Sequence, residues 1–174
     1  MRILGIDPGI GICGFGLISS SEVGLSLKAL DFGAVTTVVD APMPERLKEL
    51  YESLNLVFEQ TKPEMVAVEK LFFSKNITTG IAVAEARGVV LLVAAQKNLP
   101  VYEYSPNEIK KALTGYGAAT KTQMQEMVRV TLNLEKKPKP DDAADALAAA
   151  ITCAFLYHAG KNDDYKFSNN REKR

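Results

Sequence analysis

The chain has 174 residues, no formal net charge, and a hydrophobic content of 47%. This length supports one domain with a substantial core, and the composition excludes a chain that is disordered throughout. Zero net charge argues against a protein that coats nucleic acid indiscriminately. Cys13 and Cys153 are the only cysteines and have apolar neighbours in sequence. We therefore expect two buried, reduced thiols.

No segment of the sequence predicts association with a membrane. The amino terminus runs from Arg2 directly into a short strand-like stretch, unlike a signal peptide. The apolar stretch 83–95 is interrupted by Glu85 and Arg87 and is too short to cross a bilayer. We therefore expect a cytoplasmic protein.

Three apolar stretches with short turns between them open the chain, and they predict an antiparallel meander. Leucines at helical spacing follow, and then strands alternate with helices. The expected elements are strands at 3–7, 12–19 and 25–36, a helix at 44–60, a strand at 65–69, a helix at 77–97, a strand at 101–104, a helix beginning at 105, and helices at 120–132 and 140–156.

This order of elements predicts an α/β fold with a mixed five-stranded sheet and helices packed on both faces. The strand at 65–69 is reached by a long crossover and should run parallel to the first strand. We expect a single domain over residues 1–158, followed by a polar tail at 159–174 that is disordered. The helix at 77–97 is apolar on nearly every side, which indicates a buried helix or one shared between the core and a dimer interface.

Four acidic residues stand at the ends of apolar stretches or in the first turn of a helix: Asp7, Glu69, Asp142 and Asp145. A half-buried carboxylate costs stability unless it is paired or binds a metal. Asp7 could simply form a turn before Pro8, and the two later acids could stabilise a helix start. If all four converge, they predict a site for Mg²⁺ or Mn²⁺ and metal-dependent phosphodiester chemistry.

Positive charge is concentrated in residues 107–139, which carry seven basic and three acidic residues. The segment is therefore +4 and the rest of the chain −4. A basic surface beside an acidic pit suits a nuclease, although a solvated helix face explains the same charges.

Three further features are weaker signals. Gly9, Gly11 and Gly14 have the spacing of a dinucleotide-binding loop, but the sequence continues as a strand where that motif needs a helix. The lone histidine, His158, fits a helix end better than a ligand. Phe72 follows Glu69 in an expected loop, where it could pack against the core or stack on an unpaired base.

Several short stretches together resemble the RuvC family of Holliday junction resolvases, over residues 3 to about 152. They are Leu4-Gly5-Ile6-Asp7-Pro8-Gly9, Val68-Glu69-Lys70-Leu71-Phe72, Ala86-Arg87-Gly88-Val89, Gly115-Tyr116-Gly117 with Lys121, and Asp142-Ala143-Ala144-Asp145-Ala146-Leu147-Ala148.

The resemblance implies a ribonuclease H-like fold, a homodimer, and paired Mg²⁺-dependent cuts in four-way DNA junctions. It also implies a branch-migration helicase complex as a partner. The implied catalytic residues are Asp7, Glu69, Asp142, Asp145 and Lys121, the four acids also being the metal ligands. The expected DNA contacts are Phe72, Lys75, Lys110, Lys111 and Arg129.

We expect two ions in each active site, with Asp7 bridging them, Glu69 holding one, and Asp142 with Asp145 holding the other. Two alternatives stay open. One is a non-catalytic protein that binds DNA structures. The other is an actin-like nucleotide-binding protein, which would need two lobes where this chain has length for one.

Overall fold

The computed structural model describes residues 1–21, 25–71 and 77–167. In chain order its strands are β1 Arg2–Asp7, β2 Ile12–Ser20, β3 Leu27–Thr36, β4 Met65–Glu69 and β5 Val101–Tyr104. Its helices are α1 Met43–Thr61, α2 Ile77–Gln96, α3 Pro106–Thr114, α4 Lys121–Thr131, α5 Asp141–His158 and the short 3₁₀ helix η1 Asn162–Tyr165.

The strands form one mixed sheet in the order β3-β2-β1-β4-β5. The first three make the expected antiparallel meander. Both β4 and β5 run parallel to β1, as their long helical crossovers require. The carboxyl ends of β1, β4 and β5 therefore meet at one edge of the fold.

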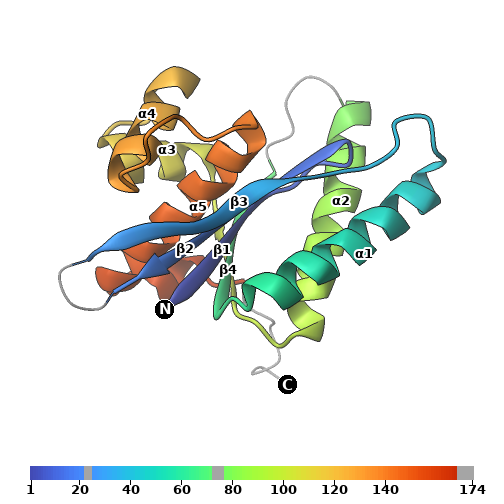
Figure 1. The fold of residues 1–174 in the computed structure, drawn as a ribbon, viewed down its shortest axis with the longest axis horizontal. Helices are drawn as coiled ribbons and strands as arrows, with labels where there is room; N and C mark the ends of the chain where they lie inside the picture. The colour runs from blue at the N-terminus through green and yellow to red at the C-terminus, as the bar shows by residue number, and fades with distance from the viewer. Residues whose placement is uncertain (22–24, 72–76, 168–174) are drawn as a thin grey trace.

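Helices cover both faces of this sheet, with α3, α4 and α5 on one side and α1 and α2 on the other (Figure 1). Each side has its own core, and residues along β1 alternate between them: Ile3 faces α5, whereas Leu4 and Ile6 face α1 and α2. The mixed five-stranded, ribonuclease H-like architecture expected from the sequence is confirmed.

Capping boxes fix where α3 and α4 begin. The Ser105 side chain accepts a hydrogen bond from the Glu108 backbone N–H, and the Glu108 carboxylate accepts one from the Ser105 N–H. Thr120 and Gln123 make the same reciprocal pair at α4. Each box satisfies backbone donors that the first turn leaves free, so both helices begin at defined positions beside the edge where β4 and β5 end.

The expected disordered tail is wrong for residues 162–167. Asn162 is buried and accepts a hydrogen bond from the Tyr104 hydroxyl. Lys166 forms an antiparallel bridge with Tyr102, and the Phe167 N–H donates to the Val101 carbonyl oxygen at 2.8 Å. This segment thus lines the outer side of β5. Nothing in its largely polar and charged sequence indicated this packing. Residues 168–174 lie outside the described residues.

Among the helices that the structure describes, none combines the length and apolar character that crossing a bilayer would need.

Candidate active site

Asp7 and Glu69 are brought together by the parallel pairing of β1 and β4. Ile3 and Met65 belong to the core on the α5 side of the sheet. Side chains alternate along a strand, so Asp7, four residues after Ile3, and Glu69, four residues after Met65, project to that same side. Both acids end their strands, and their carboxylates therefore lie on one face at one edge of the sheet.

Helix α5 reaches this edge because glycines leave room for its backbone. Gly14 pairs with Asp7 across β1 and β2. A Cβ at Gly14 would overlap the carbonyl oxygen of Asp142 and lie only 3.0 Å from its Cβ. A Cβ at Gly5 would likewise overlap the carbonyl oxygen of Ala146. A glycine inside a strand often marks such a close approach, and here it sets the first turns of α5 against the sheet beside Asp7.

The electrostatics show that the four acids share one environment. Burial raises the pKa of Asp7 to about 7, and the charges of Glu69, Asp145 and Asp142 add to the rise. Burial, followed by the charge of Asp145, raises the pKa of Glu69 to about 7 as well. Buried carboxylates that repel one another favour their neutral forms, and a cation bound between them would relieve this repulsion.

Lys121 is one of the cations that the chain itself supplies to this group. Its Nζ lies 3.1 Å from a carboxylate oxygen of Asp145 and 3.7 Å from one of Asp141. Burial lowers the pKa of Lys121, but the hydrogen bond to Asp145 and the nearby acids outweigh it, so the pKa is raised. Burial raises the pKa of Asp145 despite the opposing effect of Lys121.

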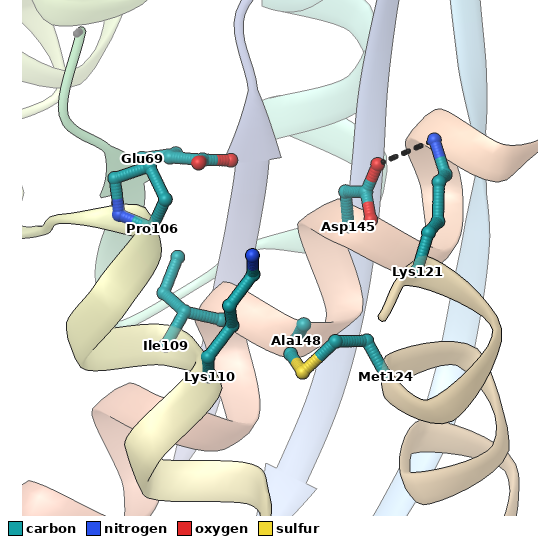
Figure 2. Close-up of a pocket in the computed structure, with 8 residues that line it drawn as sticks. All are labelled: Glu69, Pro106, Ile109, Lys110, Lys121, Met124, Asp145 and Ala148. Atoms are coloured by element: carbon teal, nitrogen blue, oxygen red, sulfur yellow. Dashed lines mark ion pairs between the residues drawn. The ribbon is translucent and has the colours of Figure 1, made fainter. Parts of the chain in front are cut away.

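Acidic and basic side chains line one cavity of about 190 Å³ between β4, α3, α4 and α5. Figure 2 shows Glu69 and Lys110 pointing into a space that Asp145 and Lys121 face from the other side. The Lys110 charge lowers the pKa of Glu69 and partly offsets the burial. The remaining lining residues are Pro106, Ile109, Met124 and Ala148.

The donor set suits a hard divalent cation, because carboxylate oxygens are the ligands that Mg²⁺ and Mn²⁺ prefer. Within residues 1–21, 25–71 and 77–167, no three acidic, histidine or cysteine side chains are already grouped closely enough to enclose one ion. The acids are thus close enough to raise one another's pKa, but they do not form a closed coordination shell. Cys13 and Cys153 are buried free thiols, as expected.

The other expected DNA contacts lie apart from this cavity or outside the described residues. Lys111 is exposed on α3 and does not line the cavity. Arg129, in the last turn of α4, donates hydrogen bonds to the Glu126 carboxylate and to the Leu134 carbonyl oxygen. Phe72 and Lys75 lie outside the described residues.

The role of Gly14 does not follow from its spacing with Gly9 and Gly11. That spacing suggested only the third glycine of a nucleotide-binding motif, whereas in the structure Gly14 leaves room for α5. The available signal was a glycine within an apolar strand. His158, expected at a helix end, lies in the last turn of α5, where its Nε2 is 2.8 Å from the Ser20 hydroxyl.

Comparisons with known proteins agree with this geometry. Residues 3–153 match the family model described as crossover junction endodeoxyribonuclease RuvC. A relative of that name from Pseudothermotoga lettingae is 54% identical over 168 residues, covering 97% of this chain and all of the relative. Another from Chloroflexus aggregans is 52% identical over 155 residues, covering 89% and 93%.

Solved structures give the same result. Thermus thermophilus RuvC in complex with a Holliday junction substrate superposes with a TM-score of 0.84 at 35% identity, covering 92% of this chain and 98% of that one. The yeast mitochondrial Holliday junction resolvase Ydc2 superposes with a TM-score of 0.62 at 15% identity, covering 92% and 82%. The second likeness shows a shared fold.

Proposed function

Because the chain belongs to the RuvC family of crossover junction endodeoxyribonucleases, we propose that it resolves four-way (Holliday) DNA junctions by paired, metal-dependent hydrolysis of phosphodiesters. Relatives with that name match this chain over nearly the full length of both proteins. The superposed Thermus thermophilus protein was solved in complex with a Holliday junction substrate. The process served is homologous recombination and repair.

The observation that carries the proposal is the grouping of four acids where β1, β4 and α5 meet. Burial and mutual repulsion raise the pKa values of Asp7 and Glu69 to about 7. A fold keeps such a costly group when it binds a ligand of opposite charge. Lys110 and Lys121 stand at the rim of the same cavity, where a phosphate between the cations and the acids would fit.

Asp7 would hold both of two Mg²⁺ or Mn²⁺ ions, Glu69 one of them, and Asp142 with Asp145 the other. Bound ions would supply an activated water and stabilise the leaving 3′-oxygen, giving a 5′-phosphate product. The chain's own cations do the rest. Lys121, 3.1 Å from Asp145, would offset negative charge that develops on the phosphorane oxygens, and Lys110 would bind the phosphate group.

DNA outside the cavity would be held through its backbone, which positions the substrate without reading its sequence. Lys111 is free to do this at the surface of α3. Arg129 would have to release its contacts with Glu126 and Leu134. We retain Phe72 as a base-stacking residue on the resemblance alone, and Lys75 as a DNA contact because it is a basic residue close to Phe72 in sequence.

A homodimer would use the exposed side of α2. Ile81, Glu85, Gly88 and Leu92 are exposed and follow one side of the helix at intervals of four, three and four residues. Ile81 and Leu92 are 53% and 50% exposed, and, the nearby backbone of α2 itself apart, no atom of the described residues lies within 4 Å of where a Cβ on Gly88 would be. Two copies could thus pack these helices closely. A two-fold dimer places one active site on each of two opposed strands of a junction.

We also propose that residues 1–158 form the nuclease domain, with η1 and its flanking residues as an extension of the sheet. A branch-migration helicase complex is the partner that the family suggests, in the cytoplasm.

Cleavage of a synthetic mobile four-way junction tests the proposal. Mg²⁺ should support paired symmetrical cuts and EDTA should stop them. Asp7→Asn or Glu69→Gln should abolish cutting and leave junction binding nearly intact, because each keeps the side chain's shape. If either variant cuts at the native rate, the assignment of that residue as a metal ligand is wrong. Junction binding by the wild type without cutting would favour a structure-binding protein, and tight nucleotide binding would favour an actin-like one.

A further inference from the structure

A second cavity adjoins the acidic one. It measures about 230 Å³ and is lined by Pro106, Asn107, Lys110 and Gly117. Pro106 and Lys110 line both cavities, so the two cavities lie on either side of these residues and share a wall. The second cavity contains no carboxylate among these residues. It is smaller than the clefts of about 300–1,000 Å³ that take whole cofactors, and its size suits a single planar base.

The Asn107 side chain is a free amide in this cavity. Asn107 is exposed near the start of α3 and, among the residues that the structure describes, its side chain has no hydrogen-bond partner. It is not needed to cap the helix, because Ser105 and Glu108 already do so reciprocally. An amide presents a donor and an acceptor side by side, the pair that reads a base edge.

Gly117 leaves the space into which this amide fits. A Cβ at Gly117 would overlap the Asn107 Oδ1 atom and lie 3.1 Å from its Cγ. The three nearest atoms to that Cβ all belong to the Asn107 side chain. The loop after α3 therefore has no side chain at the point where the amide lies. The Asn107 amide packs against the Gly117 backbone there, and this contact orients the amide without using its hydrogen-bonding atoms.

We propose that Asn107 is a specificity residue that reads the base of a nucleotide next to the phosphate being cut. This inference rests on the proposed nuclease function. Lys110 spans both cavities, so a phosphate held by Lys110 beside Glu69 brings an adjoining nucleotide to the second cavity. Phosphate contacts position a strand and base contacts specify it, and an asparagine amide bonds two atoms of an adenine edge best.

The test measures kcat/KM on junctions in which each base flanking the cut is varied through all four possibilities. The wild type should rank these junctions unequally. Asn107→Ala should reduce the ratio between the best and the worst sequence by about five- to a hundredfold, the discrimination of one bidentate contact. It should lower the rate on the best sequence and leave the rate on the worst unchanged.

Gly117→Ala is the matched variant, because it keeps the amide and displaces it. It should reduce the same ratio, and the double variant should lose no more than either single one, since both act on one group. Thr122→Ala, an exposed polar change on α4, serves as the control and should keep the wild-type ranking. Thermal unfolding should show that all four variants remain folded.

The outcomes separate this inference from the proposed function. An Asn107→Ala variant that slows every sequence equally, or that keeps the wild-type ratio, overturns the inference while the nuclease function stands. Equal cutting of all sequences by the wild type overturns it too. Additive losses in the double variant contradict the role of Gly117. If the wild type cuts no junction with Mg²⁺ or Mn²⁺, the proposed function fails and this inference fails with it.

Discussion

Lys121 reaches from the first turn of α4 to Asp145 in α5, with 3.1 Å between its Nζ and the carboxylate Oδ2. The lysine side chain is 55% exposed, so little of the fold depends on this pair. Its position over the acids matters more for charge than for stability. The pair links two helices whose starts both lie beside the ends of β1 and β4.

Lys121→Ala should lower the rate of junction cleavage by about 10²–10³-fold, because it removes a cation placed where negative charge develops. Junction binding and the melting temperature should change little. The variant should also need a higher pH for full activity, because Asp145 loses the group that opposes the rise of its pKa. Single-turnover cleavage across pH measures both effects, with Lys121→Arg as the charge-preserving control. Full activity in Lys121→Ala would contradict the role.

Asp7→Asn should stabilise the metal-free protein at neutral and alkaline pH. The pKa of Asp7 is about 7 in the folded state against 3.8 as the ordinary value. Between these values the folded chain holds a proton that the unfolded chain has released, so wild-type stability falls as pH rises through this window. A pKa difference of one corresponds to about 1.4 kcal/mol, so the rise of the Asp7 pKa from 3.8 to about 7 corresponds to a gain on the order of 4 kcal/mol at about pH 8.

Urea unfolding in EDTA at about pH 4, 6 and 8 measures this gain. The two proteins should come closest at the lowest pH, where Asp7 is neutral in the folded state and partly protonated in the unfolded state, because this pH lies near its ordinary pKa of 3.8. Addition of Mg²⁺ should reverse the order at pH 8 by stabilising the wild type alone. If stability depends on pH in the same way in both proteins, folding does not raise the pKa of Asp7.

Gly14→Ala should destabilise the protein by about 1–3 kcal/mol, because its Cβ would overlap the backbone of Asp142 and force α5 away from the sheet. Cleavage should fall further than stability accounts for, since Asp142 and Asp145 move with the helix. Gly11→Ala is the control. Its Cβ would meet only the Arg46 side chain, at 3.7 Å, which is an ordinary contact. Denaturant unfolding should separate the two variants clearly.

Leu92→Glu should dissociate the proposed dimer at micromolar concentration, because it replaces an exposed apolar side chain of the proposed interface on α2 with a charge. Val39→Glu is the matched control, since Val39 is 75% exposed and lies in the loop before α1. Light scattering after size-exclusion chromatography gives the mass of each. A Leu92→Glu protein that stays dimeric would move the interface elsewhere.

Sequence patterns predicted the elements well because their spacing reports burial directly. The continuous apolar runs of β1 and β4, each ending in an acid, and the long crossover between them predicted that Asp7 and Glu69 would lie close together. The sequence also predicted that α5 would aim its first turn at them. It did not reveal how, because the close approach depends on absent side chains at Gly5 and Gly14.

Two other features were hidden for physical reasons. Residues 162–167 are polar and read as a tail, yet their backbone hydrogen bonds to β5 do not require an apolar pattern. Arg129 was expected on DNA from its charge alone. Its bonds to Glu126 and Leu134 depend on how the chain turns after α4, which residue type does not record.

The segment that ends in Phe167 has a consequence for how these molecules behave at high concentration. A strand at the border of a sheet offers unpaired backbone groups to any passing chain, which is a route to aggregation. The Phe167 N–H, which donates to Val101, and the backbone bridge between Lys166 and Tyr102 occupy that border along β5. At the opposite border of the described sheet lies β3, which could recruit another strand. Deleting residues from 162 onward would therefore impair solubility before it impaired catalysis.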